Sequence, residues 1–335
     1  MKRFYSVFVL LLIARISFAQ DIHFSQFYSS PITLNPANAG INSCDYRAGI
    51  NYRSQWKSVT VPYKTFGAWG DIGVLKDKIL EGDVVGLGLS LVSDKAGDGE
   101  FSTTKLNFAA AYHKSLSKDK RYVLSIALGL SYVQKKLDFT KLYWDDQWNG
   151  EFFDPTEPTN ESPTVSDLNF LEFQTGLRFQ YNYSEQMRFW MGAAMYHVNS
   201  PAESFLGSNN RIGKRPVIHA GANIILNEQM FLEPSLLYMN QKKAYEMSLG
   251  SLMGYTNENW KGMTLLGGLW YRVGDAAVLV VGGQYQSFRL LMNYDFNISQ
   301  LTPASNARGG FELSLIYVGC IPKYIPPLVI PCPRL

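Results

Sequence analysis

Alternation of apolar and polar side chains is the feature that most constrains this chain. Between residues 122 and 132 every second side chain is large and apolar, while most of those between are small or polar. The apolar series is Tyr122, Leu124, Ile126, Leu128, Leu130 and Tyr132. A period of two is typical of a β-strand with one apolar face. The pattern recurs along most of the chain in segments of about ten residues, which is the signature of a transmembrane β-barrel.

Taken with the turn residues, the alternation predicts an all-β chain of about fourteen antiparallel strands closed into a barrel over residues 42–318. The strands are expected near residues 42–54, 62–74, 83–93, 100–114, 120–134, 167–181, 186–198, 214–226, 229–241, 243–255, 261–273, 276–285, 287–298 and 309–318. The alternation is weakest in 186–198. Pro234 interrupts 229–241, where a paired strand is expected to form a bulge.

Charged side chains on the second face of several strands decide between a dry sandwich and a barrel. Examples are Glu172, Arg178, Glu246 and Asp295. Burying such side chains in an apolar core is costly unless each finds a partner, and a water-containing lumen removes that cost. In lipid the sheet must also close, because an open edge would leave unpaired amide groups in hydrocarbon.

The lengths of the connections support the same assignment. The long connections near 135–166, 199–213 and 299–308 each follow an odd-numbered strand. Those after even-numbered strands are short and polar, as at 227–228 and 256–260. Outer-membrane barrels have long outer loops and short periplasmic turns. The sequence therefore predicts a protein of the cell outer membrane, surrounded by outer-membrane lipid.

The N-terminus has the features of a cleaved secretory signal peptide, residues 1–19. Basic residues precede an apolar run at 7–13, and small residues stand before the expected cut. Cleavage would remove Lys2, Arg3 and Arg15 from the 31 basic residues and none of the 28 acidic ones, so 28 of each would remain. A chain without net charge has no electrostatic footprint for phosphate binding, which excludes nucleic acid as an expected partner.

Two segments flank the predicted barrel. Residues 20–41 do not alternate, yet they are too aromatic for an exposed tail, and two prolines break regular structure. By analogy with plugged barrels we expect this segment to fold into the lumen as an N-terminal plug. A strap beneath the barrel is the alternative. Residues 319–335 are a Pro-rich C-terminal tail, expected in the periplasm.

The three cysteines suggest one bridge at a rim of the barrel. Closure makes the first and last strands neighbours, so Cys44 and Cys320 are expected close together. Cys332 follows in the tail. Pairing of Cys44 with Cys320 or with Cys332, and free thiols, all stay open, because geometry decides which sulfurs meet.

No catalytic residue, metal site or cofactor site is predicted. The four histidines lack the spacing of a metal motif, and neither a nucleophile-elbow nor a phosphate-loop motif occurs. We therefore expect no enzyme. A lipid hydrolase built from a Ser/His pair that the fold brings together is the remaining catalytic alternative.

The connection at 137–167 differs from the other loops in composition. It holds eight acidic residues and a single lysine, together with several aromatic residues. Aromatic residues are enriched where partners bind, so we predict an outer-loop contact surface at Trp144, Asp145, Asp146 and Trp148. A Ca²⁺ site and a solvated loop are the alternatives.

Several short blocks of sequence resemble one known family. They are QDIHFSQFY at 20–28, LNPA at 34–37, AG at 39–40, YRSQW at 52–56, PYKTF at 62–66, YR at 271–272, NYDFN at 293–297, GFELSL at 310–315 and CPRL at 332–335. The blocks span the mature chain and resemble the PorP/SprF family of type IX secretion system membrane proteins. Gly310 and Phe311 stand where members often have Ser-His, and Leu335 stands where an aromatic residue is usual.

The resemblance implies a component of the type IX secretion and gliding apparatus with a fold like the fourteen-stranded fatty-acid-transporter barrels. Implied partners are the type IX translocon, the periplasmic ring and, for some members, the C-terminal sorting domain of a large secreted adhesin. The family-motif positions Asn35, Pro36, Arg53, Gln55 and Trp56 become candidate partner-binding residues. Structural roles inside the barrel are the alternative for them.

A transporter for hydrophobic small molecules is the competing function. Such a protein needs a lateral opening in its wall, and Pro234 or the pair Gly267-Gly268 is the expected place for one.

Overall fold

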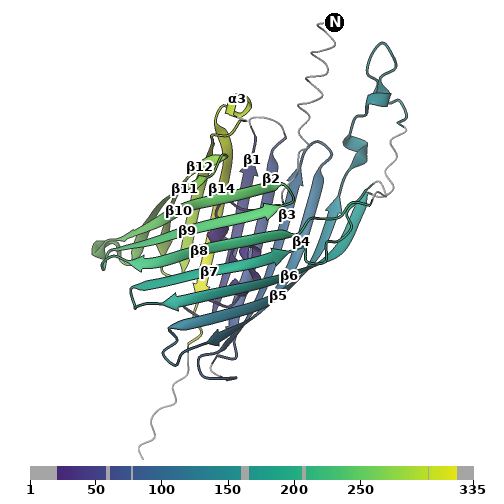
Figure 1. The fold of residues 1–335 in the computed structure, drawn as a ribbon. Coiled ribbons are helices and arrows are strands. Elements are labelled where there is room, and N and C mark those ends of the chain that lie inside the picture. Colours follow the sequence, from purple (N-terminus) through teal and green to yellow (C-terminus); the bar gives the residue numbers. More distant parts are fainter. Residues whose placement is uncertain are drawn as a thin grey trace, which may run out of the picture.

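A closed barrel of fourteen antiparallel strands forms the body of the molecule (Figure 1). The computed structural model describes residues 21–322 except 58–60, 77, 160–165, 206–208 and 301. The strands are β1 (Tyr46–Gln55), β2 (Tyr63–Val74), β3 (Val84–Ala96), β4 (Phe101–Ser115), β5 (Tyr122–Lys136), β6 (Asp167–Asn182), β7 (Met187–Tyr196), β8 (Arg215–Ile225), β9 (Met230–Gln241), β10 (Ala244–Thr256), β11 (Met263–Arg272), β12 (Ala276–Tyr285), β13 (Phe288–Asn297) and β14 (Arg308–Gly319). The predicted fold class and strand count are confirmed.

The barrel closes because its first and last strands pair. β1 and β14 run antiparallel from Tyr46 opposite Gly319 to Gln55 opposite Gly310. Every other strand pairs with its neighbours in sequence. Closure satisfies the amide groups that an open edge would expose. The strands hold 10 to 16 residues, enough for the about 9–11 that a tilted strand needs to cross a bilayer.

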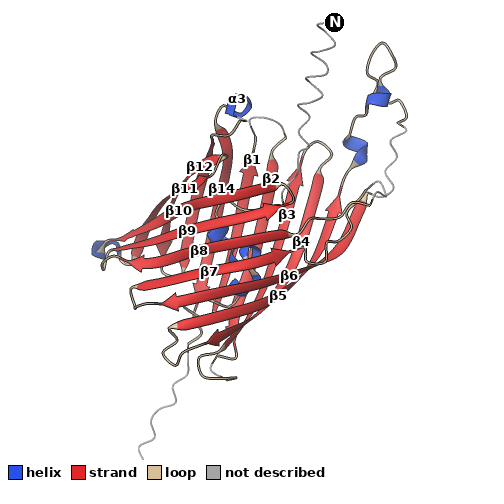
Figure 2. Ribbon diagram, in the orientation of Figure 1, coloured by secondary structure: helices blue, strands red, loops and turns tan. Residues whose placement is uncertain are grey.

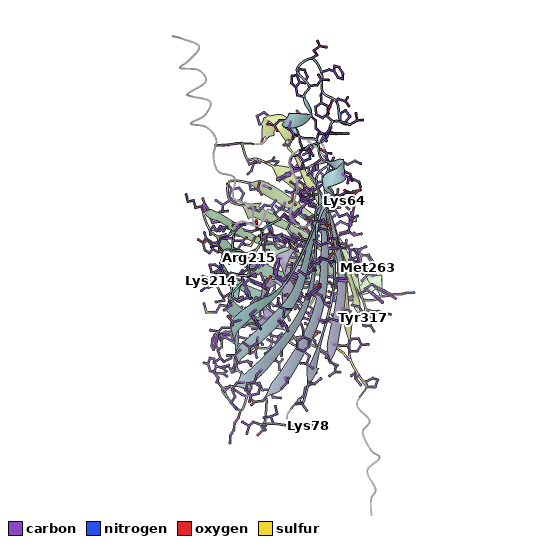
Figure 3. The ribbon with its side chains drawn as sticks, turned by 90° about the vertical axis from the view of Figure 1, so that its right-hand side faces the viewer. Lys64, Lys78, Lys214, Arg215, Met263 and Tyr317 are labelled. Atoms are coloured by element: carbon purple, nitrogen blue, oxygen red, sulfur yellow. A yellow bond between two sulfur atoms is a disulfide. The ribbon has the colours of Figure 1, made fainter. Side chains whose placement is uncertain are left out.

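The outer surface of the barrel is apolar, with aromatic side chains at its ends. Leu128 on β5 and Leu269 on β11 are more than two thirds exposed, and Met263 and Tyr317 project outward in Figure 3. Near the rim where the barrel begins and ends, Tyr122 stacks on Tyr181 with ring centroids 5.0 Å apart. An apolar band with aromatic girdles is how such barrels meet lipid.

The two rims differ, as the loop lengths predict. Lys64 and Lys78 mark opposite ends of the barrel (Figure 3). The long connections at 137–166, 197–214 and 298–307 lie at the rim of Lys64, which we call the long-loop rim. The opposite rim carries the start of β1, the end of β14 and several short turns, and we call it the terminal rim.

The inner surface consists of two unlike walls. Strands β1 to β6 turn polar or small side chains inward, and these include Asn51, Thr65, Ser90, Asn107, Ser131 and Gln174. Strands β7 to β13 contribute most of one buried apolar cluster, which contains Ala194, Tyr196, Val217, Leu237, Met239, Leu252, Leu266, Trp270, Val278, Val280 and Leu291. The wall of β7 to β13 is therefore richer in apolar side chains than that of β1 to β6, although it also holds buried polar groups such as His219 and Asp295.

Residues 21–41, which we call the inner segment, occupy the lumen between these walls. Three short helical turns, η1 (Phe27–Ser29), α2 (Pro31–Leu34) and η2 (Pro36–Asn38), lie inside the barrel (Figure 2). Phe27 packs in the apolar cluster and Ile32 is fully buried. Among the described residues, no helix is long and apolar enough to cross a membrane.

Three irregularities interrupt the ladders. β7 ends at Tyr196 because His197 adopts a left-handed backbone conformation with φ of 56°, which shortens the strand predicted over 186–198. The β8–β9 ladder is interrupted opposite Pro234, which has no N–H to donate, yet the register is unchanged on either side. The bulge expected at Pro234 is thus wrong. A register shift occurs instead between β13 and β14, near Tyr294.

The signal peptide predicted for residues 1–19, residue 20, Cys332 and the tail beyond 322 lie outside the described residues.

Candidate functional site: the inner segment and the outer loop

The inner segment begins at the long-loop rim, where a chain of charged groups fixes Asp21. The Asp21 backbone N–H donates to Gln241 Oε1 over 2.9 Å. Its carboxylate lies 2.6 Å from His197 Nε2, and His197 Nδ1 lies 3.2 Å from Glu172 Oε2. Lys105 Nζ completes the chain, 2.7 Å from Glu172. One histidine is thus held between two carboxylates that come from different parts of the protein.

His197 and Asp21 lie outside the strands, and the pKa values of both reflect this pairing. Burial disfavours the charged form of His197, but the carboxylates of Asp21 and Glu172 outweigh it and raise the pKa of His197. Burial likewise opposes ionisation of Asp21, but Arg215 and His197 hold the pKa of Asp21 well below its usual range. The contact therefore favours the charged forms of both side chains.

The next attachment joins the inner segment to β14 through one carboxylate. Glu312 accepts hydrogen bonds from the backbone N–H groups of Ser25, over 2.9 Å, and Gln26, over 3.1 Å. The Gln26 side chain donates to Asn293 over 2.6 Å and accepts from Ser314 over 2.7 Å. Glu312 and Gln26 are almost completely buried. Because the segment has no sheet partner here, side chains of the barrel satisfy its backbone.

Arg53 and Arg272 surround the same attachment. Ser25 Oγ donates to Asp295 over 2.7 Å, and Arg272 donates to the same carboxylate over 2.7 Å. Arg53 donates to the backbone carbonyl of His23 over 2.5 Å and lies 3.7 Å from Asp295. His23 Nε2 in turn lies 2.7 Å from Glu246 Oε2. Strands β1, β10, β11 and β13 thus all hold residues 23–25.

Asn35 forms the third attachment, deep in the barrel. Its side-chain N–H group donates to the backbone carbonyl of Leu177 over 3.0 Å and lies 3.1 Å from His219 Nε2. Its oxygen accepts from Ala37 N over 2.9 Å and so caps η2, where Pro36 occupies the first turn. The Asn-Pro pair therefore both turns the chain and ties it to β6 and β8.

Glycines make the close approach possible. A Cβ atom on Gly86 would lie 1.9 Å from the carbonyl oxygen of Ala39, and one on Gly176 would lie 2.1 Å from Asn35 Oδ1. Ala39 O also lies 2.8 Å from His113 Nε2, within hydrogen-bond distance. Any side chain at these glycines would push the inner segment off the wall. The glycines of β3 and β6 thus leave the space that residues 35–39 occupy.

The structure separates the five family-motif positions into two groups. Asn35, Pro36 and Arg53 are buried within the barrel, where their polar contacts are internal. Gln55 at the end of β1 and Trp56 beside it at the long-loop rim are both half-buried. Trp56 packs edge-on against Tyr63 with ring centroids 5.1 Å apart. Partner binding by these residues stays a prediction, and only the last two reach the surface.

The described part of the outer loop at 137–166 projects beyond the long-loop rim (Figure 1). Its tip is organised around Gln147, which is buried and donates to the carbonyl groups of Pro155 and Glu157 over 3.2 and 3.1 Å. A β-bridge joins Trp148 to Phe153. The aromatic rings of the loop remain on the surface, since Tyr143 is 71% and Trp148 55% exposed.

Of the predicted outer-loop residues, Trp144 precedes the short helix η4 (Asp145–Gln147) and its N–H donates to Gln147 Oε1 over 2.9 Å. Asp145 and Asp146 form the first turn of η4, and Asp146 accepts from Thr159 over 2.9 Å. The structure thus brings Trp144, Asp145 and Asp146 together at one turn, next to Trp148. Partner binding or Ca²⁺ binding there stays a prediction.

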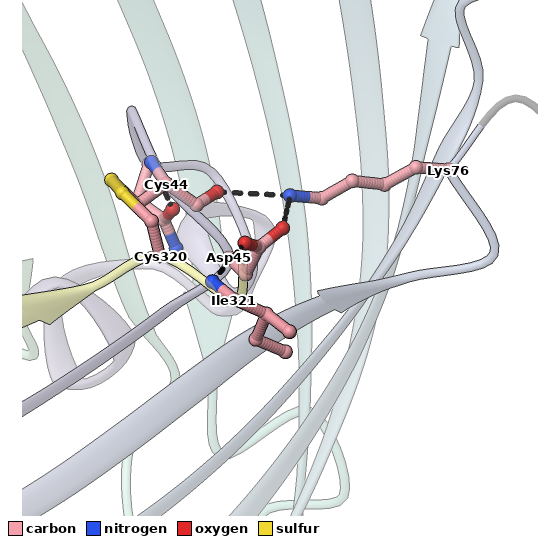
Figure 4. Close-up of a disulfide and its surroundings, with 6 residues drawn as sticks. Cys44, Asp45, Lys76, Cys320 and Ile321 are labelled. Atoms are coloured by element: carbon pink, nitrogen blue, oxygen red, sulfur yellow. Dashed lines mark hydrogen bonds and ion pairs between the residues drawn. A yellow bond between two sulfur atoms is a disulfide. The ribbon is translucent and has the colours of Figure 1, made fainter. Parts of the chain in front are cut away.

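A disulfide at the terminal rim joins the start of β1 to the end of β14. Cys44, just before β1, and Cys320, just after β14, are bonded with Cα atoms 4.6 Å apart (Figure 4). Lys76 Nζ donates to the carbonyl of Cys44 over 2.9 Å and pairs with Asp45 over 2.6 Å. Asp45 also accepts from the N–H of Ile321 over 2.6 Å. Among the alternatives left by the sequence, the structure thus contains the pair at the closing seam.

Sequence reasoning missed Glu312, His197 and His219 as residues that hold the inner segment. Glu312, like Glu172, lies in a strand with alternating apolar side chains, so the sequence could have predicted that it points inward. Its partners could not be predicted, because they lie almost the whole chain away. Across the residues that the structure describes, no group of three or more His, Cys, Asp or Glu side chains is arranged to hold a metal ion.

A closed barrel with an apolar outer belt, aromatic rims and a polar-lined interior defines the class of outer-membrane β-barrel proteins. Within that class the chain belongs to the PorP/SprF family of type IX secretion system membrane proteins, whose model matches residues 16–317. It is thus a membrane protein of the type IX secretion family, located in the outer membrane.

Solved structures are similar to this chain at low sequence identity. The Pseudomonas putida toluene transporter TodX is similar with a TM-score of 0.50 and 10% identity, over 88% of this chain and 93% of that one. The Ralstonia pickettii toluene transporter TbuX has a TM-score of 0.48 and 11% identity, over 85% of this chain and 91% of that one. At these identities the likeness concerns the fold alone. No curated protein sequence matches the chain.

Proposed function

We propose that this protein is a non-enzymatic scaffold of the type IX secretion and gliding machinery. In this role it supports secretion or surface anchoring of a large adhesin by binding the C-terminal sorting domain of that adhesin. The translocon and the periplasmic ring are the machine components that it would join. The family supplies the assignment to the secretion system.

The observation that carries the proposal is the fixed interior. Asp21, Glu312 and Asn35 mark three separate attachments between the inner segment and the barrel wall. The cavity left beside the inner segment measures only about 40 Å³, which is room for a few water molecules. With the inner segment held at three points, we expect partners to bind at the rims and not to pass through the lumen.

The two rims offer different surfaces for partners. The long-loop rim carries the exposed aromatic and acidic outer loop, and aromatic residues are enriched in protein interfaces. The terminal rim carries the disulfide-stapled seam and short turns. We assign the sorting domain to the outer loop and machine components to the terminal rim.

Purification from native cells in mild detergent tests the proposal. The protein is expected to carry translocon and ring components with it, and a deletion strain is expected to lose secretion or anchoring of the adhesin. Recovery of the protein alone, together with normal secretion in the deletion strain, would contradict the scaffold role.

Matched aromatic variants test which rim binds the sorting domain. Trp148→Ala combined with Phe152→Ala removes two exposed rings from the outer loop, and both side chains are more than half exposed. Tyr183→Ala removes an equally exposed ring at the terminal rim and is the control. Capture of the purified sorting domain should fall at least about tenfold in the loop variant, as hot-spot aromatics typically contribute. The reverse ranking would contradict the assignment to the outer loop.

Transport of hydrophobic small molecules is the second candidate, because an apolar cluster lines part of the lumen and the β8–β9 ladder is interrupted at Pro234. The cavity beside Phe24, Leu34 and Val217 is far smaller than the about 150 Å³ that accommodates benzene. Transport would therefore require the inner segment to move. Uptake of toluene that is unchanged by deletion would exclude this candidate, and uptake lost on deletion with secretion intact would favour it over the scaffold.

A further inference from the structure

Arg178 is a buried guanidinium group without an acidic partner. It points into the lumen from β6 and is only 7% exposed. One of its terminal nitrogens donates to Gln180 over 2.9 Å, while the other, Nη1, has no hydrogen-bond partner. Among the described residues no carboxylate forms an ion pair with it. The charged groups that act on it are Arg47 and Arg188, both positive.

The other inward-facing arginines show that the barrel ordinarily neutralises such groups. The pairs are Arg47 with Asp71, Arg53 and Arg272 with Asp295, Arg215 with Asp21, and Arg289 with Glu233. A buried charge is normally paired because isolation from water disfavours it strongly. Arg178 is thus an exception within one and the same lumen, and its missing counter-charge needs an explanation.

Between Arg178 and the terminal rim, β6 turns only polar side chains inward. On the long-loop side Asn35 covers the next inward position of β6, Gly176. On the other side follow Gln180 and Asn182, whose side chains are linked over 2.8 Å. Asn182 lies opposite Arg188 on β7, and the Arg188 side chain is exposed. An anion that enters from the terminal rim would meet Arg188 first and Arg178 behind it.

We propose that Arg178 and Arg188 form a binding site for a small oxyanion, a phosphate or a carboxylate, in the half of the lumen below the inner segment. A planar guanidinium group donates two parallel hydrogen bonds to such an anion. The anion would supply the missing acceptor for Arg178 Nη1. The site does not depend on the scaffold role, because it rests on the lumen alone.

The test uses the full-length protein in detergent, at fixed pH and ionic strength, with sodium phosphate or sodium citrate replacing sodium chloride. Binding of radiolabelled inorganic phosphate is measured by equilibrium dialysis and the unfolding midpoint by intrinsic fluorescence. We expect one saturable phosphate site and a midpoint that rises with phosphate concentration, since a ligand that binds only the folded state stabilises it. A larger response to citrate than to phosphate would identify the carboxylate as the better ligand.

Three variants separate an anion site from a structural arginine. R178Q keeps a polar group beside Gln180 but removes the unpaired charge, so its midpoint in chloride should equal or exceed that of the parent protein, and its phosphate response should vanish. R188Q, at an exposed position, should weaken phosphate binding at least fivefold without changing the midpoint in chloride. R289Q breaks the pair with Glu233 and is the control: its midpoint should fall while phosphate binding persists.

Three results would overturn the proposal. The first is no phosphate binding and no citrate response in the parent protein. The second is an unchanged response in R178Q. The third is a midpoint of R178Q in chloride that falls as far as that of R289Q, because this would give Arg178 a structural role without an anion.

Discussion

The inner segment and the outer loop are both aromatic stretches that lie outside the strands, but their side chains have opposite environments. Phe24 and Phe27 of the inner segment are less than a tenth exposed, whereas Tyr143 and Trp148 of the outer loop are more than half exposed. The inner segment also gives its backbone N–H groups to the barrel, as at Glu312, while the loop satisfies its own backbone through Gln147.

The difference shows which region holds the structure together and which is available to other molecules. A segment whose groups are bound at several points to the wall contributes to stability and has little surface left for a partner. A loop that folds on itself and exposes its rings contributes little to the barrel but can bind. Substitutions in the two regions should therefore affect different measurements.

The largest expected loss of stability comes from the disulfide, which lies in neither region, and the effects in both regions can be compared with it. Cys44→Ser removes the disulfide between residues that are 276 positions apart. The free energy of unfolding should fall by about 4 kcal/mol. Urea titration in detergent, followed by tryptophan fluorescence, measures it. Cys320→Ser should behave identically, and Cys332→Ser should leave stability unchanged. Equal losses in all three variants would contradict the Cys44–Cys320 pairing.

Gly86→Ala disrupts the contact between β3 and the inner segment. The new Cβ would meet the carbonyl oxygen of Ala39, a backbone atom that cannot rotate away. We expect a loss of about 3 kcal/mol, typical of a severe steric clash in a packed interior, and new proteolytic cleavage within residues 21–41.

Gly267→Ala is the matched control for Gly86→Ala. It places the same methyl group on the barrel where nothing lies within 4 Å. Its effect should be close to zero or slightly stabilising, because glycine is a poor strand residue. Similar losses in both variants would show that the inner segment is not seated on β3.

The His197 contact makes the inner segment pH-dependent. Because the folded protein raises the pKa of His197 above its ordinary value of about 6.5, the stabilisation is complete below that value and is lost as pH rises through the folded pKa. The lowered pKa of Asp21 acts in the opposite direction, only under acidic conditions, and stays constant in this window.

The measurement compares the parent protein with His197→Gln between about pH 6 and about pH 9, on either side of the ordinary histidine pKa. The free-energy difference between the two proteins should shrink as pH rises through this range, because His197 then loses the charge that its two carboxylate neighbours stabilise. A difference that does not change with pH would contradict a charged His197 in the folded protein.

The smallest effect on stability is expected in the outer loop. Trp148→Ala removes an exposed ring, and the free energy of unfolding should change by less than about 0.5 kcal/mol. Sorting-domain capture should nevertheless fall in this variant and remain normal in Gly267→Ala. A large loss of stability with unchanged capture would reverse the roles of the two regions.

The sequence was sufficient for the barrel because lipid imposes a simple rule on each strand. Leu128 and its neighbours alternate so regularly that the direction of each side chain follows from period two. β12 is harder to predict from alternation, because both of its faces are apolar. Val278 and Val280 point into the apolar cluster of the lumen, while Leu279 and Val281 face outward. Its length and turns, rather than alternation, locate it.

The contacts of the inner segment could not be predicted from the sequence. The aromatic content of residues 20–41 indicated burial, but Ser25 meets Glu312 across a separation of 287 positions. Which barrel residue faces which part of the segment depends on the depth at which it lies in the lumen, and no local pattern encodes that depth. Closure of the lumen by this segment as a plug stays a prediction.

Cysteine labelling tests most directly whether the inner segment is fixed and the outer loop is free. In a protein carrying Cys332→Ser, a cysteine replaces either Ala37, which is fully buried, or Phe152, which is 56% exposed. We expect a water-soluble maleimide to label position 152 within minutes in the folded protein and position 37 only after unfolding. Equal labelling rates at the two positions in the folded protein would contradict an inner segment held in the lumen.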